Sequence, residues 1–127
     1  QYFILPELKV ATFKVFFDGP QKRYRFFEWA ARFDSIFTTY GDQVIVVRRD
    51  FYYNEVQIPS IELFEDVEFF RKARKKTKIH KLNIPVFTSV RRFKNKGFFR
   101  MNLLNSFLMI GFVLGVNTSL LHRIYYK

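Results

Sequence analysis

A chain of 127 residues has room for one small domain and little else, because single domains usually hold about 100 to 150 residues. Its 18 Phe, 7 Tyr and 1 Trp supply more apolar surface than a small core needs. It contains no cysteine, which excludes disulfides, thiolate metal sites, iron–sulfur ligation and a cysteine nucleophile.

The net charge of +11 is unevenly distributed along the chain. Residues 1–68 carry all 11 acidic side chains and 8 basic ones, whereas residues 69–127 carry 14 basic side chains and no acidic one. So basic a segment is attracted to anionic lipid head groups or to nucleic-acid phosphates.

Residues 1–76 are predicted to form a small, aromatic-rich α+β domain. The alternation of residues 11–17 predicts a strand with one buried face, which ends at the turn residues 18–20. Residues 25–33 favour a helix, although part of this run also alternates like a strand. Residues 44–47 predict a short central strand. Residues 51–58 are a candidate partner strand, and the alternative is a turn at Asn54 and Glu55.

The clearest helix of this domain is predicted over residues 61–76. Ser60 can cap its first amides, its acidic residues lie near the positive end of the helix dipole, and its basic residues lie near the negative end. Its apolar residues recur on one face: Leu63, Phe64, Val67 and Phe70.

Residues 77–100 lack a clear periodicity and are predicted to form a basic connector that lies on a surface, with Gly97 as a hinge. Twelve basic side chains, from the end of the predicted helix through this connector, are the candidate contacts for anionic lipid or phosphate. They are Arg71, Lys72, Arg74, Lys75, Lys76, Lys78, Lys81, Arg91, Arg92, Lys94, Lys96 and Arg100.

Residues 101–122 are predicted to form a single C-terminal transmembrane helix, followed by a short polar tail at 123–127. The segment holds 22 residues without a charged side chain, and roughly 20 apolar residues suffice to cross about 30 Å of hydrocarbon. Basic and aromatic residues flank it: Phe98, Phe99, Arg100, Arg123, Tyr125 and Tyr126. Its polar residues leave a buried helix of a soluble protein as the alternative.

Four residues of this segment are candidates for packing against neighbouring helices. Gly111 and Gly115 form a GxxxG pair that permits close approach of another helix, although membrane helices also simply tolerate glycine. Asn105 and Asn117 can form hydrogen bonds with neighbouring helices.

No catalytic, cofactor or metal site is predicted. The sequence has no P-loop, no GxGxxG and no GxSxG motif. His80 lies inside the basic run, and His122 lacks the partner histidine that a membrane haem site requires.

These features predict a non-catalytic accessory subunit of a multi-subunit mitochondrial inner-membrane complex, such as a respiratory-chain complex or the ATP synthase. Its partners are expected to be other subunits and anionic lipid such as cardiolipin. The positive-inside rule places the N-terminal domain in the matrix. The assignment to mitochondria depends on residue types with A+T-rich codons, the basic domain and the absence of cysteine.

Two alternatives remain open at this stage. One is a protein of an organellar ribosome, whose basic half binds ribosomal RNA and whose hydrophobic helix is buried among neighbours. The other is a tail-anchored adaptor that recruits a soluble partner through its N-terminal aromatic residues.

Overall fold

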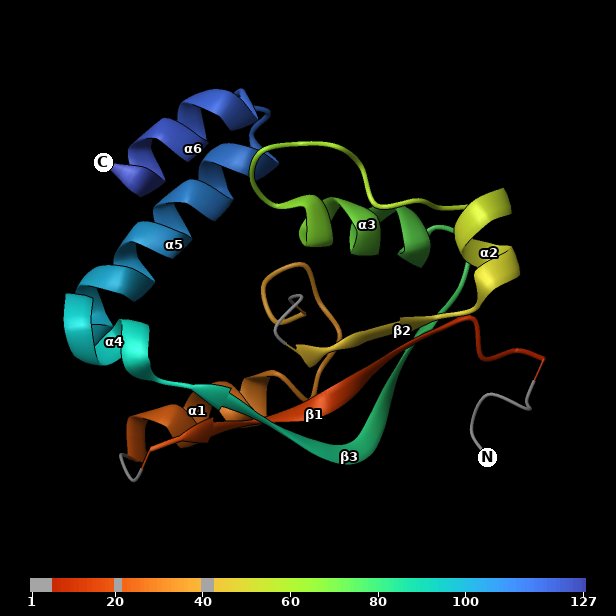
Figure 1. The fold of residues 1–127 in the computed structure, drawn as a ribbon, viewed down its shortest axis with the longest axis horizontal. Helices are drawn as coiled ribbons and strands as arrows, with labels where there is room; N and C mark the ends of the chain where they lie inside the picture. The colour runs from red at the N-terminus through yellow and green to blue at the C-terminus, as the bar shows by residue number, and fades with distance from the viewer. Residues whose placement is uncertain (1–5, 20–21, 40–42) are drawn as a thin grey trace.

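The fold was obtained as a computed structural model, which describes residues 6–19, 22–39 and 43–127, without the side chains of Arg92, Phe93, Lys96 and Phe98. Three strands and the helices around them follow one another along the chain (Figure 1). In order they are β1 (Val10–Asp18), α1 (Lys22–Ala30), β2 (Ile45–Val47), α2 (Arg49–Asn54), α3 (Glu65–Arg74), β3 (Ile79–Ser89), α4 (Arg91–Lys96), α5 (Phe98–Val113) and α6 (Thr118–Tyr126).

The sheet has the order β2-β1-β3, so that β1 is its central strand. β1 is antiparallel to β2 and parallel to β3, and Val10 pairs with both Val47 and Ile79. The predicted strand over residues 11–17 is therefore confirmed. The strand predicted over residues 44–47 exists as β2, but it lies at an edge of the sheet and not at its centre.

β3 and α4 occupy residues 79–89 and 91–96 of the predicted connector, so the connector prediction is wrong. The strand pairs with the whole of β1, but the register shifts where the partner of Phe13 is Leu82 and the partner of Lys14 is Pro85. Asn83 and Ile84 are the extra residues of this bulge. Proline lacks a donor and bulges interrupt alternation, which is why the segment showed no strand periodicity in the sequence.

The main core lies between the sheet and helices α2 and α3. It consists of Val10, Phe51, Val56, Phe69, Phe70, Ala73 and Ile79, all of them buried. The predicted strand over residues 51–58 is wrong, because its first residues form α2 and place Phe51 in this core. Burying each of the valine, isoleucine and phenylalanine side chains of this core stabilises the fold by about 1.5–3 kcal/mol.

Two of the predicted helices are present with shifted boundaries. α1 begins three residues before the predicted range of 25–33, and turns continue it through Phe33. α3 begins at Glu65, later than predicted, because Phe64 adopts a left-handed conformation with φ of 64° and stands at the N-cap position. Ser60 therefore does not cap this helix.

The predicted transmembrane helix is wrong, because two helices and a turn occupy residues 98–126. α5 holds 16 residues and α6 holds 9, and within the described residues no helix is long and apolar enough to cross a membrane. Gly115, with φ of 86°, ends the first helix, and the side chain of Asn117 accepts a hydrogen bond from the Ser119 amide (2.8 Å) to cap the second. Gly115 and Asn117, which a single membrane span could accommodate, are the residues at which the helix ends and the next one begins.

α6 folds back along α5, and the pair lies beside the sheet and α3 (Figure 1). Phe112 of α5 contacts Phe64, which precedes α3, with 5.2 Å between the ring centroids. Met101, Leu108 and Met109 of α5 are buried, as is Leu121 of α6. The fold is thus a small α+β domain to which a C-terminal helical hairpin is attached.

Candidate functional site

Four of the twelve candidate cations, all near α3, form ion pairs within the chain. Arg71 and Lys72 contact Glu68, with nitrogen–oxygen distances of 2.8 and 3.8 Å. Lys76 lies 3.9 Å from Glu55. Arg74 makes two hydrogen bonds with Asp34, from Nε (2.9 Å) and from Nη2 (2.6 Å). Because these cations already contact carboxylates within the chain, they are weaker candidates for phosphate contacts than cations without such partners.

Asp34 joins α3 to the segment that follows α1. Besides Arg74, its carboxylate accepts a hydrogen bond from the Thr39 hydroxyl (2.8 Å). Lys81 of β3 donates to the same Thr39 oxygen (3.0 Å) and to Gln43. Burial raises the pKa of Asp34, but the hydrogen bonds from Arg74 and Thr39 and the charges of Arg74 and Lys81 outweigh it and lower the pKa below its ordinary value. Lys81 is therefore a structural residue.

Five of the predicted cations are exposed and form no ion pair in the part of the chain that the structure describes. They are Lys75, Lys78, Arg91, Lys94 and Arg100. Arg92 and Lys96 lie among the side chains outside the description. The structure thus divides the predicted basic set into a paired group around α3 and an unpaired group, most of which follows β3.

The residue that joins β3 to α4 packs on the first turn of α1. Val90, which immediately precedes α4, packs on Tyr24 of α1, and both side chains are only 2% exposed. α1 and α4 lie at the same end of the sheet (Figure 1). Their exposed cations are Lys22, Arg23 and Arg25 in α1 and Arg91 and Lys94 in α4. We call these five exposed cations the basic end.

Acidic side chains only partly offset the basic end. Asp18, at the end of β1, is exposed and pairs in register with Ser89 of β3. Glu28 is half-buried, and its Oε1 accepts a hydrogen bond from the Phe17 amide (3.0 Å). The sequence prediction missed the three cations of α1 because it assigned basic character to the second half of the chain. The run Lys22-Arg23-Tyr24-Arg25 was the available signal.

A row of exposed aromatic side chains lies along α1 and the turn after it. Phe26, Trp29 and Phe33 are 63%, 52% and 57% exposed. The ring centroids of Phe26 and Trp29 are 5.9 Å apart, and those of Trp29 and Phe33 are 5.2 Å apart. We call these three residues the aromatic row. Their spacing of three and four residues is visible in the sequence, and the structure shows that all three side chains are exposed.

α5 carries a second exposed apolar surface. Phe99, Leu103, Phe107, Ile110 and Leu114 recur every three or four residues and are all exposed, Phe99 to 79%. We call this set the α5 stripe. Since the opposite side of α5 is buried in the chain, the helix is apolar all round, which explains why its sequence resembles a membrane span.

The four residues proposed for helix packing have different roles. Gly111 faces α6, because a Cβ at this position would lie 3.1 Å from Leu121 Cδ2. Gly115 ends α5, and Asn117 caps α6. Asn105 is exposed. Gly111 thus permits helix packing, but with a helix of the same chain.

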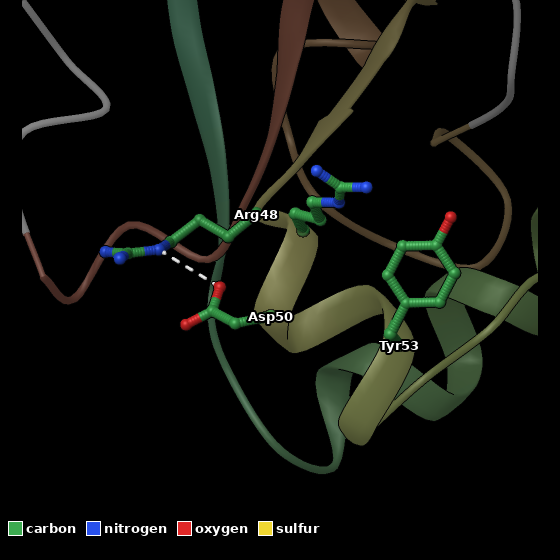
Figure 2. Close-up of a pocket in the computed structure, with 4 residues that line it drawn as sticks. Arg48, Asp50 and Tyr53 are labelled. Carbon is green, nitrogen blue, oxygen red and sulfur yellow. Dashed lines mark ion pairs between the residues drawn. The ribbon is translucent and has the colours of Figure 1, made fainter.

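A shallow depression at the start of α2 is lined by Arg48, Arg49, Asp50 and Tyr53. Arg48 Nε lies 3.4 Å from Asp50 Oδ1, and Figure 2 shows this pair on the opposite side of the helix from Tyr53. A hydrogen bond from the Phe51 amide and the charge of Arg48 lower the pKa of Asp50. The polar groups do not converge on one point, so they form no nucleophile or acid–base pair.

In the described ranges, no three His, Asp or Glu side chains lie where they could hold a metal ion. His80 is half-buried on β3 and His122 stacks on Tyr126, with 4.5 Å between the ring centroids. Comparison of the chain with protein-family models, with curated proteins and with solved structures finds no match.

Proposed function

We propose that this chain is a non-catalytic structural component of a ribonucleoprotein assembly, in which the basic end holds the RNA backbone. The observation that carries the proposal is the juxtaposition of Lys22, Arg23 and Arg25 with Arg91 and Lys94. α1 and α4, which β2 and β3 separate in the sequence, both carry exposed cations at the same end of the sheet. Clusters of this kind neutralise phosphates and release their counterions.

The division of the basic side chains supports this assignment. Around α3, where carboxylates are available, arginine and lysine form ion pairs within the chain. Residues 69–127 contain no acidic side chain, so the cations of α4 have no neighbour in sequence that could neutralise them. A polyanion is the partner that such a surface fits.

The α5 stripe favours a second candidate, a peripheral accessory subunit of a mitochondrial inner-membrane complex. Exposed apolar stripes of this length are typical of protein contacts. In this version the stripe packs on other subunits, and the basic end contacts an anionic lipid such as cardiolipin. A matrix location, proposed from composition and charge, is compatible with either candidate.

The two candidates differ in the polyanion that they require. The full chain should be titrated with a fluorescent RNA that contains an unpaired loop and, separately, with vesicles that contain cardiolipin. We expect saturable binding to the RNA that weakens steeply with salt. Binding to the vesicles alone would overturn the RNA assignment in favour of the second candidate.

Paired charge reversals locate the contact on the surface. The change Arg91→Glu with Lys94→Glu should weaken RNA binding about tenfold or more and reduce the slope of log affinity against log salt by about 1 to 2, because each lost phosphate contact removes roughly 0.7 to 0.9. Lys75→Glu with Lys78→Glu is the matched control. It alters the net charge equally, and its residues precede the 11-residue strand β3, whereas α4 follows that strand. Equal losses in both variants would contradict a specific basic end.

A further inference from the structure

We infer that the aromatic row of Phe26, Trp29 and Phe33 is a stacking platform for unpaired RNA bases. The inference rests on the proposed function, since it names the part of the RNA that this protein holds. The basic end would supply phosphate contacts, and the row would supply contacts to the bases.

The row is exposed because of how α1 sits in the fold. Tyr24 and Phe27 of the same helix pack with Phe17 and Val90, so they supply the contacts that hold α1 to the sheet. The row occupies a different side of the helix, and each of its rings is more than half exposed. Three adjacent exposed rings on α1 and the turn after it form an apolar patch of the kind that marks a binding site.

The spacing of the rings suits nucleic acid. Their centroids follow one another at 5.9 and 5.2 Å, and the planes are tilted by 34° and 71°. They therefore form a run of separate faces and edges on which successive unstacked bases can rest. Every base has a π-face, so a platform of this kind accepts many sequences, whereas a continuous duplex keeps its base faces inaccessible.

Cations border the row. Lys22 lies four residues before Phe26, and Arg25 lies four residues before Trp29, the spacing at which side chains on a helix are neighbours. Arg32, next to Phe33, is also exposed. Aromatic rings interleaved with arginine and lysine are the combination by which proteins hold single strands.

The carboxylates near the aromatic row already accept hydrogen bonds within the chain, and the cations beside the row outnumber them. Residues 22–39 contain two acidic side chains, Glu28 and Asp34. Glu28 accepts a hydrogen bond from the Phe17 amide, and Asp34 accepts two hydrogen bonds from Arg74. The flank of the row is therefore positive.

Trp29 is the single tryptophan of the chain, so its fluorescence reports directly on the row. The full chain should be titrated with a short oligoadenylate and with an abasic oligonucleotide that has the same number of phosphates. We expect saturable quenching of Trp29 by the oligoadenylate, little quenching by the abasic strand, and at least tenfold weaker binding of the abasic strand.

A variant that keeps the reporter tests the platform itself. Phe33→Leu preserves an apolar side chain and Trp29, and should weaken oligoadenylate binding about fivefold or more without affecting the abasic strand. Tyr53→Leu, which removes an equally exposed ring on α2, is the matched control and should change neither affinity.

The outcomes separate this inference from the proposed function. Equal binding of both strands with unchanged Trp29 fluorescence would overturn base stacking and leave phosphate binding intact. Binding of neither strand would overturn both. If Phe33→Leu abolishes a protein contact and leaves both affinities unchanged, the row is a protein interface and the inference is wrong.

Discussion

α3 is an amphipathic helix and α5 is a largely apolar one, and the two differ in how far the chain satisfies their side chains. α3 buries Val67, Phe69, Phe70 and Ala73 against the sheet, and its arginines pair with Glu68 and Asp34. α5 buries one side and leaves the α5 stripe in water, next to cations that have no carboxylate in the same half of the sequence. The apolar and charged side chains of α3 find their contacts within the chain, whereas the α5 stripe is an exposed apolar surface of the kind that other proteins cover.

The largest expected effect is in the core below α3. Phe69→Ala should lower the free energy of unfolding by about 3–5 kcal/mol, because it removes a fully buried ring and leaves a cavity. Leu103→Ala, in the α5 stripe, should change it by less than about 0.5 kcal/mol. Urea denaturation of both variants measures the difference. Similar losses would show that the stripe is covered within the free chain.

The Asp34–Arg74 pair gives a smaller, pH-dependent effect. Asp34→Asn should lower the free energy of unfolding by about 1.5–3 kcal/mol at neutral pH, because it weakens hydrogen bonds to a charged group. The pKa of Asp34 is lower in the folded state, so its contribution is present above the unfolded pKa and is lost as pH falls through the folded pKa. Thermal unfolding between about pH 6 and pH 2 should therefore show a shallower acid decline in the variant. A parallel decline in both proteins would contradict this role.

The turn between α5 and α6 gives the smallest effect. Asn117→Ala should cost about 1 kcal/mol, because the Ser119 amide loses its cap, and Gly115→Ala should cost a similar amount, because alanine disfavours a φ of 86°. Asn105→Ala, at an exposed position of α5, is the control and should have little effect. Unchanged stability of Asn117→Ala would indicate that residues 98–126 do not form this hairpin.

The sequence predicted the parts of the fold whose pattern is local. The alternation around Ala11 and Phe17 identified the central strand, and the dipole-matched charges identified the helix that contains Val67 and Phe70. The start of this helix was predicted too early. The left-handed backbone at Phe64 delays it, and phenylalanine rarely adopts that conformation, so the sequence did not indicate it.

The parts that failed depend on tertiary context. Pro85 and the bulge beside it disguised β3, which is a strand only because the whole of β1 is its partner. The apolar run of residues 101–122 resembled a span because α5 has apolar residues both on the side that packs and on the side that does not. Glycine is common just after a helix C-terminus and asparagine is a common N-cap, so Gly115 and Asn117 were available signals for a break between two helices.

The candidate site was predicted only in part. Among the proposed phosphate contacts, Arg91, Lys94 and Arg100 are exposed, whereas Arg74 and Lys81 are held by polar partners distant in sequence. Pairings over such separations cannot be read from a single sequence. The basic run at the start of α1 was visible in the sequence, but its position at the same end of the sheet as α4 depends on the Tyr24–Val90 contact.

Sedimentation of the native protein before and after RNase treatment tests the central proposal most directly. A structural component of a ribonucleoprotein should sediment with large particles and move to light fractions when the RNA is digested. If its sedimentation is unaffected by RNase but changes when mild detergent disperses membranes, the RNA assignment is wrong and the chain belongs to a membrane-associated protein complex.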